Sequence, residues 1–419
     1  MPRLPEDFRQ RLLPIALSQG VGVLCGVIGV RVATQLVPPA LYGQYGVLLS
    51  FAPLGQWVVH AGLVRYVNRH WAAMPERSSG AAALVALAVR RLPWLLLACG
   101  IAALSLDAWS WGTATALLFG TAAFLSFGAF AQAALQADRS HWRDLAANTA
   151  LGVTRTFLPL LLFAATGVAV ALPAGLLLSA LSFAAVAALV LGVMPRRSGP
   201  MLALPPAYVG ALFPLLALSG WALTGVTRWV AAGFLASETA GYFTLANNVG
   251  AILPGVFVAI AIQYAQPGWF AQPHATMDER RALLRQVDRM AAKFVIVTLI
   301  ALGALHLVAP WLVGPLIHEK FRPAIGYLFP AGCFAVATAT AAFYQSLLLA
   351  VRREDRIGGI EVAFSIGLLA AGAVAGWAGE AWFRAWLIAA PAWPWLCYRT
   401  LARRALLKPD APAAPAPGL

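Results

Sequence analysis

Charged residues are scarce in this chain, and most of them lie in short segments between long apolar stretches. Only 11% of the 419 residues are charged and 61% are hydrophobic, with a mean hydropathy of +0.76. A soluble domain carries about 25% charged residues, so a soluble globular enzyme of this size is excluded. Glycine and proline recur without a period, which excludes fibrous and disordered classes. The composition therefore indicates an integral membrane protein.

The apolar stretches are long enough to cross a bilayer as helices, since a spanning helix takes about 20 residues. We expect spans at Arg11–Gln35, Tyr45–Val67, Leu84–Leu106, Trp109–Leu135, Leu145–Thr166, Ala169–Val193, Tyr208–Leu235, Gly241–Gln266, Ala292–Ile317, Ile325–Val351, Ile357–Trp377 and Ala381–Leu401. The predicted fold class is an all-α polytopic membrane protein with about 12 transmembrane helices. The loops leave no room for a large domain outside the membrane.

The distribution of Lys and Arg predicts the topology. With the N-terminus in the cytoplasm, 24 of the 30 Lys and Arg residues fall in cytoplasmic segments. The opposite side holds 3 (Lys320, Arg322 and Arg384), and the spans hold the other 3 (Arg31, Arg155 and Arg228). This asymmetry follows the positive-inside rule, so both termini are expected in the cytoplasm. Topology also accounts for the net charge of +14, and we expect no nucleic-acid partner.

A polar segment after the sixth span divides the chain into halves. We expect a six-helix N-terminal lobe at residues 1–193, a cytoplasmic linker at 194–206, a six-helix C-terminal lobe at 207–407 and a disordered cytoplasmic tail at 408–419. Transporters are often built from two such repeats around a central site. The layout predicts two halves of six helices each.

A weak internal repeat supports this division. Arg31 near the end of the first span is followed by Gly43, and Arg228 near the end of the seventh is followed by Gly241. A tyrosine adjoins each glycine. Both helix pairs start in the cytoplasm, so the repeat is a parallel one.

One cytoplasmic segment, between the eighth and ninth spans, has helical amphipathicity. Leu283, Leu284, Val287 and Met290 share one face of the stretch MDERRALLRQVDRM, and charges occupy the other. We expect a helix that lies in the membrane interface. A helix docked on the bundle is the alternative.

Three arginines within the spans are the candidate ligand-binding residues. A charge at the bilayer centre costs at least ~2.5–3.5 kcal/mol on insertion scales, so such residues usually serve a function. Arg155 lies near the midplane, and Asn148 lies on the same face of its helix. With Arg228 and Arg31 it would form a cationic cavity. Guanidinium groups donate paired hydrogen bonds to phosphate oxygens, so we expect an anionic ligand.

Other polar residues in the spans complete the candidate set. Gln56, Asn247 and Asn248 are expected to line the same cavity, and Glu361 is a candidate for ion coupling, with a salt bridge to the nearby basic loop as the alternative. The four cysteines have no metal or redox spacing. The sequence has no P-loop, HExxH or GxSxG motif, so we expect no catalytic residue, metal or cofactor, and no enzyme activity.

Several local phrases make the chain resemble the O-antigen and polysaccharide flippase family of the multidrug/oligosaccharidyl-lipid/polysaccharide exporter superfamily. The phrases are LVPPALYGQYGVLLS, AGLVRYVNRH, ALQADRSHWRDLAANTALGVTR and TRWVAAGFLASETAGYFTLANN. With the helix layout, the resemblance reaches to about Leu407. Many relatives have an Asp-Arg pair in the seventh helix, where this chain has Thr227-Arg228.

The resemblance implies two six-helix lobes around a central cavity, and alternating access. It also implies an undecaprenyl-pyrophosphate-linked sugar as substrate, carried across the bacterial inner membrane for O-antigen, capsule or exopolysaccharide assembly. It implies the lipid bilayer, a polysaccharide polymerase and chain-length proteins as partners. Two alternatives stay open: a cation-coupled multidrug exporter of the same fold, and a membrane polysaccharide polymerase or ligase. Three arginines within the spans, against a single glutamate, count against cationic drugs, and short outer loops leave little room for a polymerase site.

Overall fold

The computed structural model describes residues 13–47, 49–50, 66, 112–137, 140–191, 225–271, 276–351 and 354–407. All structural statements below concern these residues. The second and third predicted spans, the linker, the tail and the start of the seventh span lie largely or wholly outside them.

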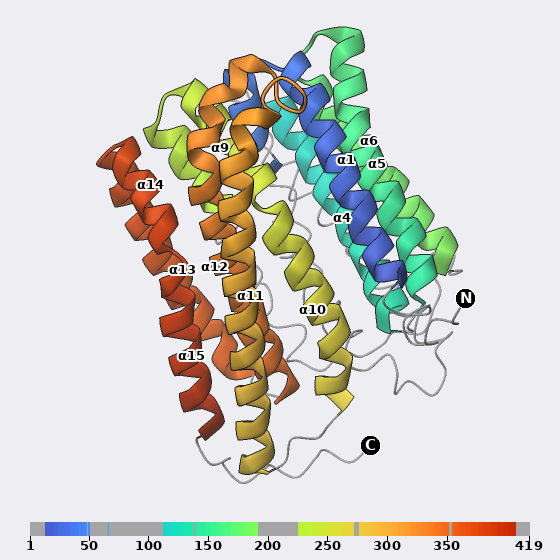
Figure 1. The fold of residues 1–419 in the computed structure, drawn as a ribbon. Helices are drawn as coiled ribbons and strands as arrows, with labels where there is room; N and C mark the ends of the chain where they lie inside the picture. The colour runs from blue at the N-terminus through green and yellow to red at the C-terminus, as the bar shows by residue number, and fades with distance from the viewer. Residues whose placement is uncertain are drawn as a thin grey trace, which may run out of the picture.

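The described part of the N-terminal half contains four long helices that lie side by side (Figure 1). They are α1 (Leu13–Leu36), α4 (Gly112–Ala137), α5 (His141–Thr166) and α6 (Ala171–Leu191). A further helical segment, at residues 39–47, follows α1. Helix α5 ends at Gly167, whose φ of 68° is the left-handed conformation that favours glycine. Its backbone N–H donates to the Phe163 carbonyl.

The described part of the C-terminal half is a second bundle. A helical segment at residues 225–234 is followed by α9 (Ser237–Gly250), α10 (Ile252–Ala271), α11 (Met277–Leu312), the 3₁₀-helix η4 (Glu319–Ala324), α12 (Ile325–Ala350), α13 (Glu354–Trp377), α14 (Glu380–Ala389) and α15 (Ala392–Leu407). The predicted span Gly241–Gln266 is divided between α9 and α10, near Pro254. The predicted span Ala381–Leu401 is divided between α14 and α15, at Pro391. Proline lacks an N–H and disfavours a helical residue before it, which explains both breaks.

Helix α11 corrects one prediction. It runs without a break for 36 residues, beginning at a capping box between Thr276 and Glu279. Its length of about 54 Å exceeds a bilayer core of about 30 Å. Leu283 and Val287 are buried in the core of the C-terminal half. The amphipathic stretch is thus the first part of the ninth span's helix. The expectation that it lies in the interface is wrong, and the docked alternative holds.

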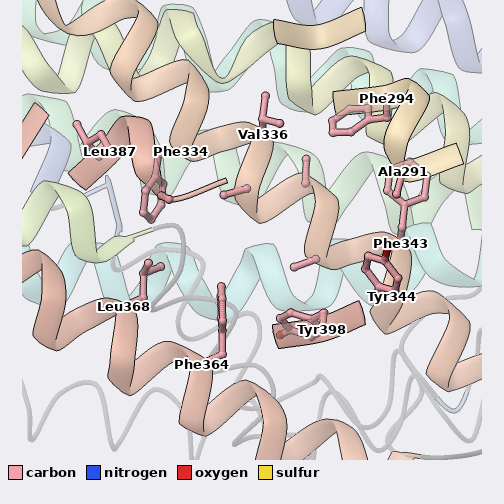
Figure 2. Packing of buried hydrophobic residues seen from close by; sticks show 14 of the residues in the cluster. Ala291, Phe294, Phe334, Val336, Phe343, Tyr344, Phe364, Leu368, Leu387 and Tyr398 are labelled. Atoms are coloured by element: carbon pink, nitrogen blue, oxygen red, sulfur yellow. The ribbon is translucent and has the colours of Figure 1, made fainter. Parts of the chain in front are cut away.

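Helix α12 is the centre of the C-terminal bundle. Figure 2 shows Phe343 and Tyr344 of α12 beside Ala291 of α11, with Tyr398 of α15 nearby. Phe334, nearer the start of α12, lies close to Leu387 of α14. Six of the described helical segments are long and apolar enough to span a membrane. The predicted all-α polytopic fold class is confirmed.

The two halves meet at the end of the bundle where α1 and α5 end and α6, α9 and α12 begin. We call it the contact end; it lies at the top of Figure 1. A Cβ added to Gly43 would lie 2.9 Å from the backbone N of Gly241, and one added to Gly241 would lie 2.0 Å from the carbonyl oxygen of Pro39. The two glycines that repeat in sequence therefore pack against each other. Only glycine allows this backbone approach.

Replacing Gly241 tests this contact. We expect Gly241→Ala to destabilise the protein by about 1–3 kcal/mol, because the new methyl group meets backbone that has no rotamer to change. Thermal unfolding of the purified protein in detergent measures the effect. Gly233→Ala is the matched control, since no heavy atom lies within 4 Å of the added Cβ. Equal melting temperatures for the two variants would contradict the packing described here.

Candidate functional site

Hydrogen bonds between the halves hold the contact end closed. The Arg31 guanidinium at the end of α1 donates to the Gly314 carbonyl, in the loop that follows α11. The backbone N–H of His318 donates to the Thr34 hydroxyl at 3.2 Å. The Lys320 ammonium donates to the Gln35 carbonyl at 3.0 Å. The last turns of α1 are thus tied to the loop between α11 and α12.

An aromatic side chain fills the centre of this junction. Phe321 of η4 is fully buried, and its ring packs edge-on against Tyr42 from the N-terminal half and Tyr242 from the C-terminal half. The ring centroids are 5.6 Å and 6.1 Å apart, within the favourable range for such pairs. The tyrosines that adjoin the two repeated glycines therefore converge on one phenylalanine.

Arg228 forms hydrogen bonds to both halves. Its guanidinium donates to the Asn248 side-chain oxygen of α9 at 2.7 Å and, in a longer contact of 3.4 Å, to the Gly46 carbonyl. The Asn248 amide in turn donates to the Tyr42 hydroxyl at 3.0 Å. The Nε of Arg228 is buried and has no hydrogen-bond partner. One donor of this guanidinium thus remains available for an acceptor.

Arg155 belongs to the same electrostatic cluster. It interacts electrostatically with Arg228 and with Tyr45, without a hydrogen bond to either. Its neighbours in α5 are used for packing: Thr154 bonds to Ser179 of α6, and Gly29 of α1 packs against Thr156. The Arg155 side chain is exposed and has no hydrogen bond or ion pair to the described residues. Two neighbouring guanidinium groups thus repel each other in the absence of an anion.

We call Arg155, Arg228, Asn248, Tyr42 and Tyr45 the arginine cluster. It brings together side chains from α5, α9 and the helical segments at 39–47 and 225–234. No acidic side chain of the described residues pairs with either arginine. Phenol and amide groups supply hydrogen bonds without cancelling the positive charge.

Other predicted site residues lie elsewhere or outside the described residues. Arg31 is engaged at the contact end, as described above. The side-chain oxygen of Asn148 accepts a hydrogen bond from the Gln132 amide of α4 at 2.9 Å, and Asn247 is buried in α9. Gln56 lies outside the described residues. Glu361 lies within α13, but its side chain is not described. The ligand-binding roles of these residues stay predictions.

The sequence analysis missed both tyrosines of the cluster as site residues. The sequence pattern included Tyr42 only as the tyrosine that adjoins Gly43, and it gave neither Tyr42 nor Tyr45 a role in ligand binding. Their spacing of three residues places them on one helix face, which indicates that the two side chains lie in the same environment. Among the described residues, no group of three His, Cys, Asp or Glu side chains is arranged to hold a metal ion.

Comparison with known proteins relates the chain to transporters by fold. No family model matches it, and no curated protein sequence matches it. Solved structures match over nearly its whole length. The lipid II flippase MurJ in an inward closed conformation has a TM-score of 0.67 at 10% identity, covering 94% of this chain and 87% of that one.

Transporters of the MATE family in the MOP superfamily match as well. An outward-facing structure has a TM-score of 0.63, covering 96% of this chain and 95% of that one, and an inward-facing structure has 0.59, covering 92% and 94%. Both are 14% identical to this chain. The chain therefore has the roughly twelve-helix fold of the MOP transporter superfamily. At these identities the likeness concerns the fold alone.

A cysteine pair across the contact end tests the junction. We expect Thr34→Cys combined with His318→Cys to form a disulfide on mild oxidation, because the Thr34 hydroxyl touches the backbone of His318. The pair would be placed in a chain whose four native cysteines are replaced by serine, with a protease site inserted in the segment 194–206. After cleavage, the oxidised halves should migrate together on a denaturing gel. Each single-cysteine protein is the control, and halves that separate after oxidation would contradict the junction.

Proposed function

We propose that this chain is a flippase for lipid-linked oligosaccharides. Its substrate would be an undecaprenyl-pyrophosphate-linked repeat unit, moved across the bacterial inner membrane for assembly of O-antigen, capsule or exopolysaccharide. The observation that carries the proposal is the arginine cluster. It places two guanidinium groups at the junction of the halves without an acidic partner among the described residues. A pyrophosphate is an anion that such a cluster favours.

In the proposed mechanism the halves rock against each other around the cluster. The contact end, which the charge distribution assigns to the periplasmic side, is closed in this structure. The pyrophosphate would bind Arg155 and Arg228 from the cytoplasmic side while the lipid tail stays in the bilayer. Opening the contact end would break the bonds of Arg31, Thr34 and Lys320 to the opposite half. The anion would then be released outside.

The absence of an acid beside Arg228 bears on how the transporter is driven. Thr227 occupies the position where many flippase relatives have an aspartate, and its hydroxyl is fully buried without a hydrogen-bond partner. A carboxylate at this position would add a negative charge near Arg228 and weaken the electrostatic attraction of the site for phosphate. We therefore assign Arg228 to substrate binding. Glu361 remains the sequence-based proposal for ion coupling.

A cation-coupled exporter of small molecules is the second candidate. The similarity to MATE transporters of known structure favours it. The charge of the arginine cluster counts against a cationic drug as the substrate, because bringing a cation beside two guanidinium groups costs electrostatic energy. The polymerase or ligase alternative has less support. The described segment between α11 and α12 is short, and its side chains are used to join the halves.

Substitution of Arg155 tests the leading proposal in cells that lack the chromosomal gene. We expect Arg155→Ala to trap lipid-linked repeat units on the cytoplasmic leaflet and to reduce surface polysaccharide by at least about tenfold, if one charge-assisted contact of about 1.5–3 kcal/mol is lost. Arg155→Lys should recover part of the activity, because lysine keeps the charge but not the planar pair of donors. Leaflet accumulation and surface polymer are the two measurements.

The control for this experiment is Arg281→Ala at matched membrane levels. Arg281 is exposed at the start of α11 and pairs only with Asp278 one turn earlier. We expect wild-type polysaccharide from this variant. Normal polysaccharide in the deletion strain would overturn the flippase proposal, and drug-accumulation assays would then test the exporter. Full rescue by Arg155→Ala would leave the function intact and remove Arg155 from the site.

A further inference from the structure

A basic pocket lies near the end of α15, at the opposite end of the C-terminal bundle from the contact end (Figure 1). Its volume is about 240 Å³, and its lining consists of Leu396, Arg399, Thr400, Arg403 and Arg404. Three of these residues are arginines and none is acidic. Sites for drug-sized molecules are larger, at about 300–1,000 Å³. The size and the lining of this pocket therefore fit a small anionic group.

One of the three arginines is paired with an acid of α11. Arg399 donates to Oδ2 of Asp288 at 3.2 Å, and Oδ1 of Asp288 accepts a hydrogen bond from the Tyr344 hydroxyl at 2.8 Å. Both oxygens of this carboxylate thus have partners. Arg403 and Arg404 are exposed and form no hydrogen bond or ion pair with the described residues. The pocket therefore keeps two guanidinium groups without an acidic partner among the described residues.

The guanidinium groups are the donors that this pocket offers. The Thr400 hydroxyl donates to the Leu396 carbonyl at 2.5 Å, so its hydrogen is already in use. Arg399 and Arg403 are four residues apart, and like charges at this spacing repel each other on a helix. An anion between them relieves this repulsion. Phosphate oxygens suit the site, because the planar guanidinium fork donates paired hydrogen bonds to them.

An exposed apolar strip leads along α15 to the pocket. Trp393 and Leu396 are exposed, and Thr400 and Arg403 follow them, with intervals of three, four and three residues between the four. These residues therefore share one face of the helix. Tryptophan is typical of the interface between a membrane and water. The face changes from apolar to basic over about 15 Å, which matches the order of acyl chain and phosphate in a phospholipid.

We propose that this pocket binds the phosphate of an anionic phospholipid. Arg403 and Arg404 bind the phosphate oxygens, and the acyl chains lie along Trp393 and Leu396. The charge distribution assigns this end of α15 to the cytoplasmic leaflet, and basic pockets on that side of membrane helices bind anionic headgroups. A phospholipid suits the site better than free phosphate, because the apolar strip adjoins the pocket. The proposal does not depend on what the transporter carries.

Native mass spectrometry of the delipidated full chain tests the pocket. The protein is titrated with phosphatidylglycerol, with phosphatidylethanolamine and with inorganic phosphate. We expect phosphatidylglycerol to bind at least about tenfold more tightly than phosphatidylethanolamine, because it alone of the two lipids carries a net negative charge. Replacing both Arg403 and Arg404 by glutamine should weaken the phosphatidylglycerol adduct at least about tenfold.

The matched control replaces both Arg285 and Arg289 by glutamine. These two arginines of α11 are exposed and are not part of the pocket lining, so the change in net charge is the same. We expect this control to keep the wild-type affinity for phosphatidylglycerol. Circular dichroism checks that both double variants fold.

Four outcomes would overturn the proposal. Equal weakening in the two double variants would assign the binding to diffuse positive charge. An adduct of wild-type strength after loss of Arg403 and Arg404 would show that the lipid does not bind in this pocket. Equal affinity for the two lipids would remove the role of the negative charge. Displacement of phosphatidylglycerol by an equal concentration of inorganic phosphate would assign the pocket to a free anion.

Discussion

The structure depends on a contact in which the backbones of the two halves touch. A bilayer supplies little hydrophobic force between helices, so helices associate through close packing of small residues and through hydrogen bonds. Gly43 and Gly241 satisfy the first condition, and a side chain at Gly241 would collide with the Pro39 carbonyl. The bonds of Arg31 and Lys320 across the junction satisfy the second. Within the described residues, both kinds of contact join the halves at the contact end.

The same junction sets the geometry of the candidate site. Tyr42 is one residue from Gly43, and Arg228 donates to the Gly46 carbonyl, so the arginine cluster is held by the segment that makes the glycine contact. Arg31 and Arg228 occupy matching positions in the two halves, and each donates to a backbone carbonyl of the other half. These two side chains therefore tie the candidate site to the junction between the halves.

Two polar features of the N-terminal half differ in how they are satisfied. Arg155 is exposed, without a hydrogen bond or ion pair to the described residues, and can meet an anion directly. Asp144 is buried, and only one of its oxygens is bonded. The helix α5 carries both residues.

The sequence by itself determined the membrane class and, to within a few residues, the bounds of described helices such as α1, α6 and α12. These follow from local composition: apolar length fixes a span, and arginine placement predicts its direction. Composition could not reveal that the stretch containing Leu283 continues the ninth helix, nor that Asp144 is buried, since both depend on which helices pack beside them. Only the tertiary structure decided that Arg228 meets Asn248 and Tyr42 while Arg31 bonds elsewhere. Packing determines which residues far apart in sequence become hydrogen-bond partners, and the local sequence pattern does not specify these pairs.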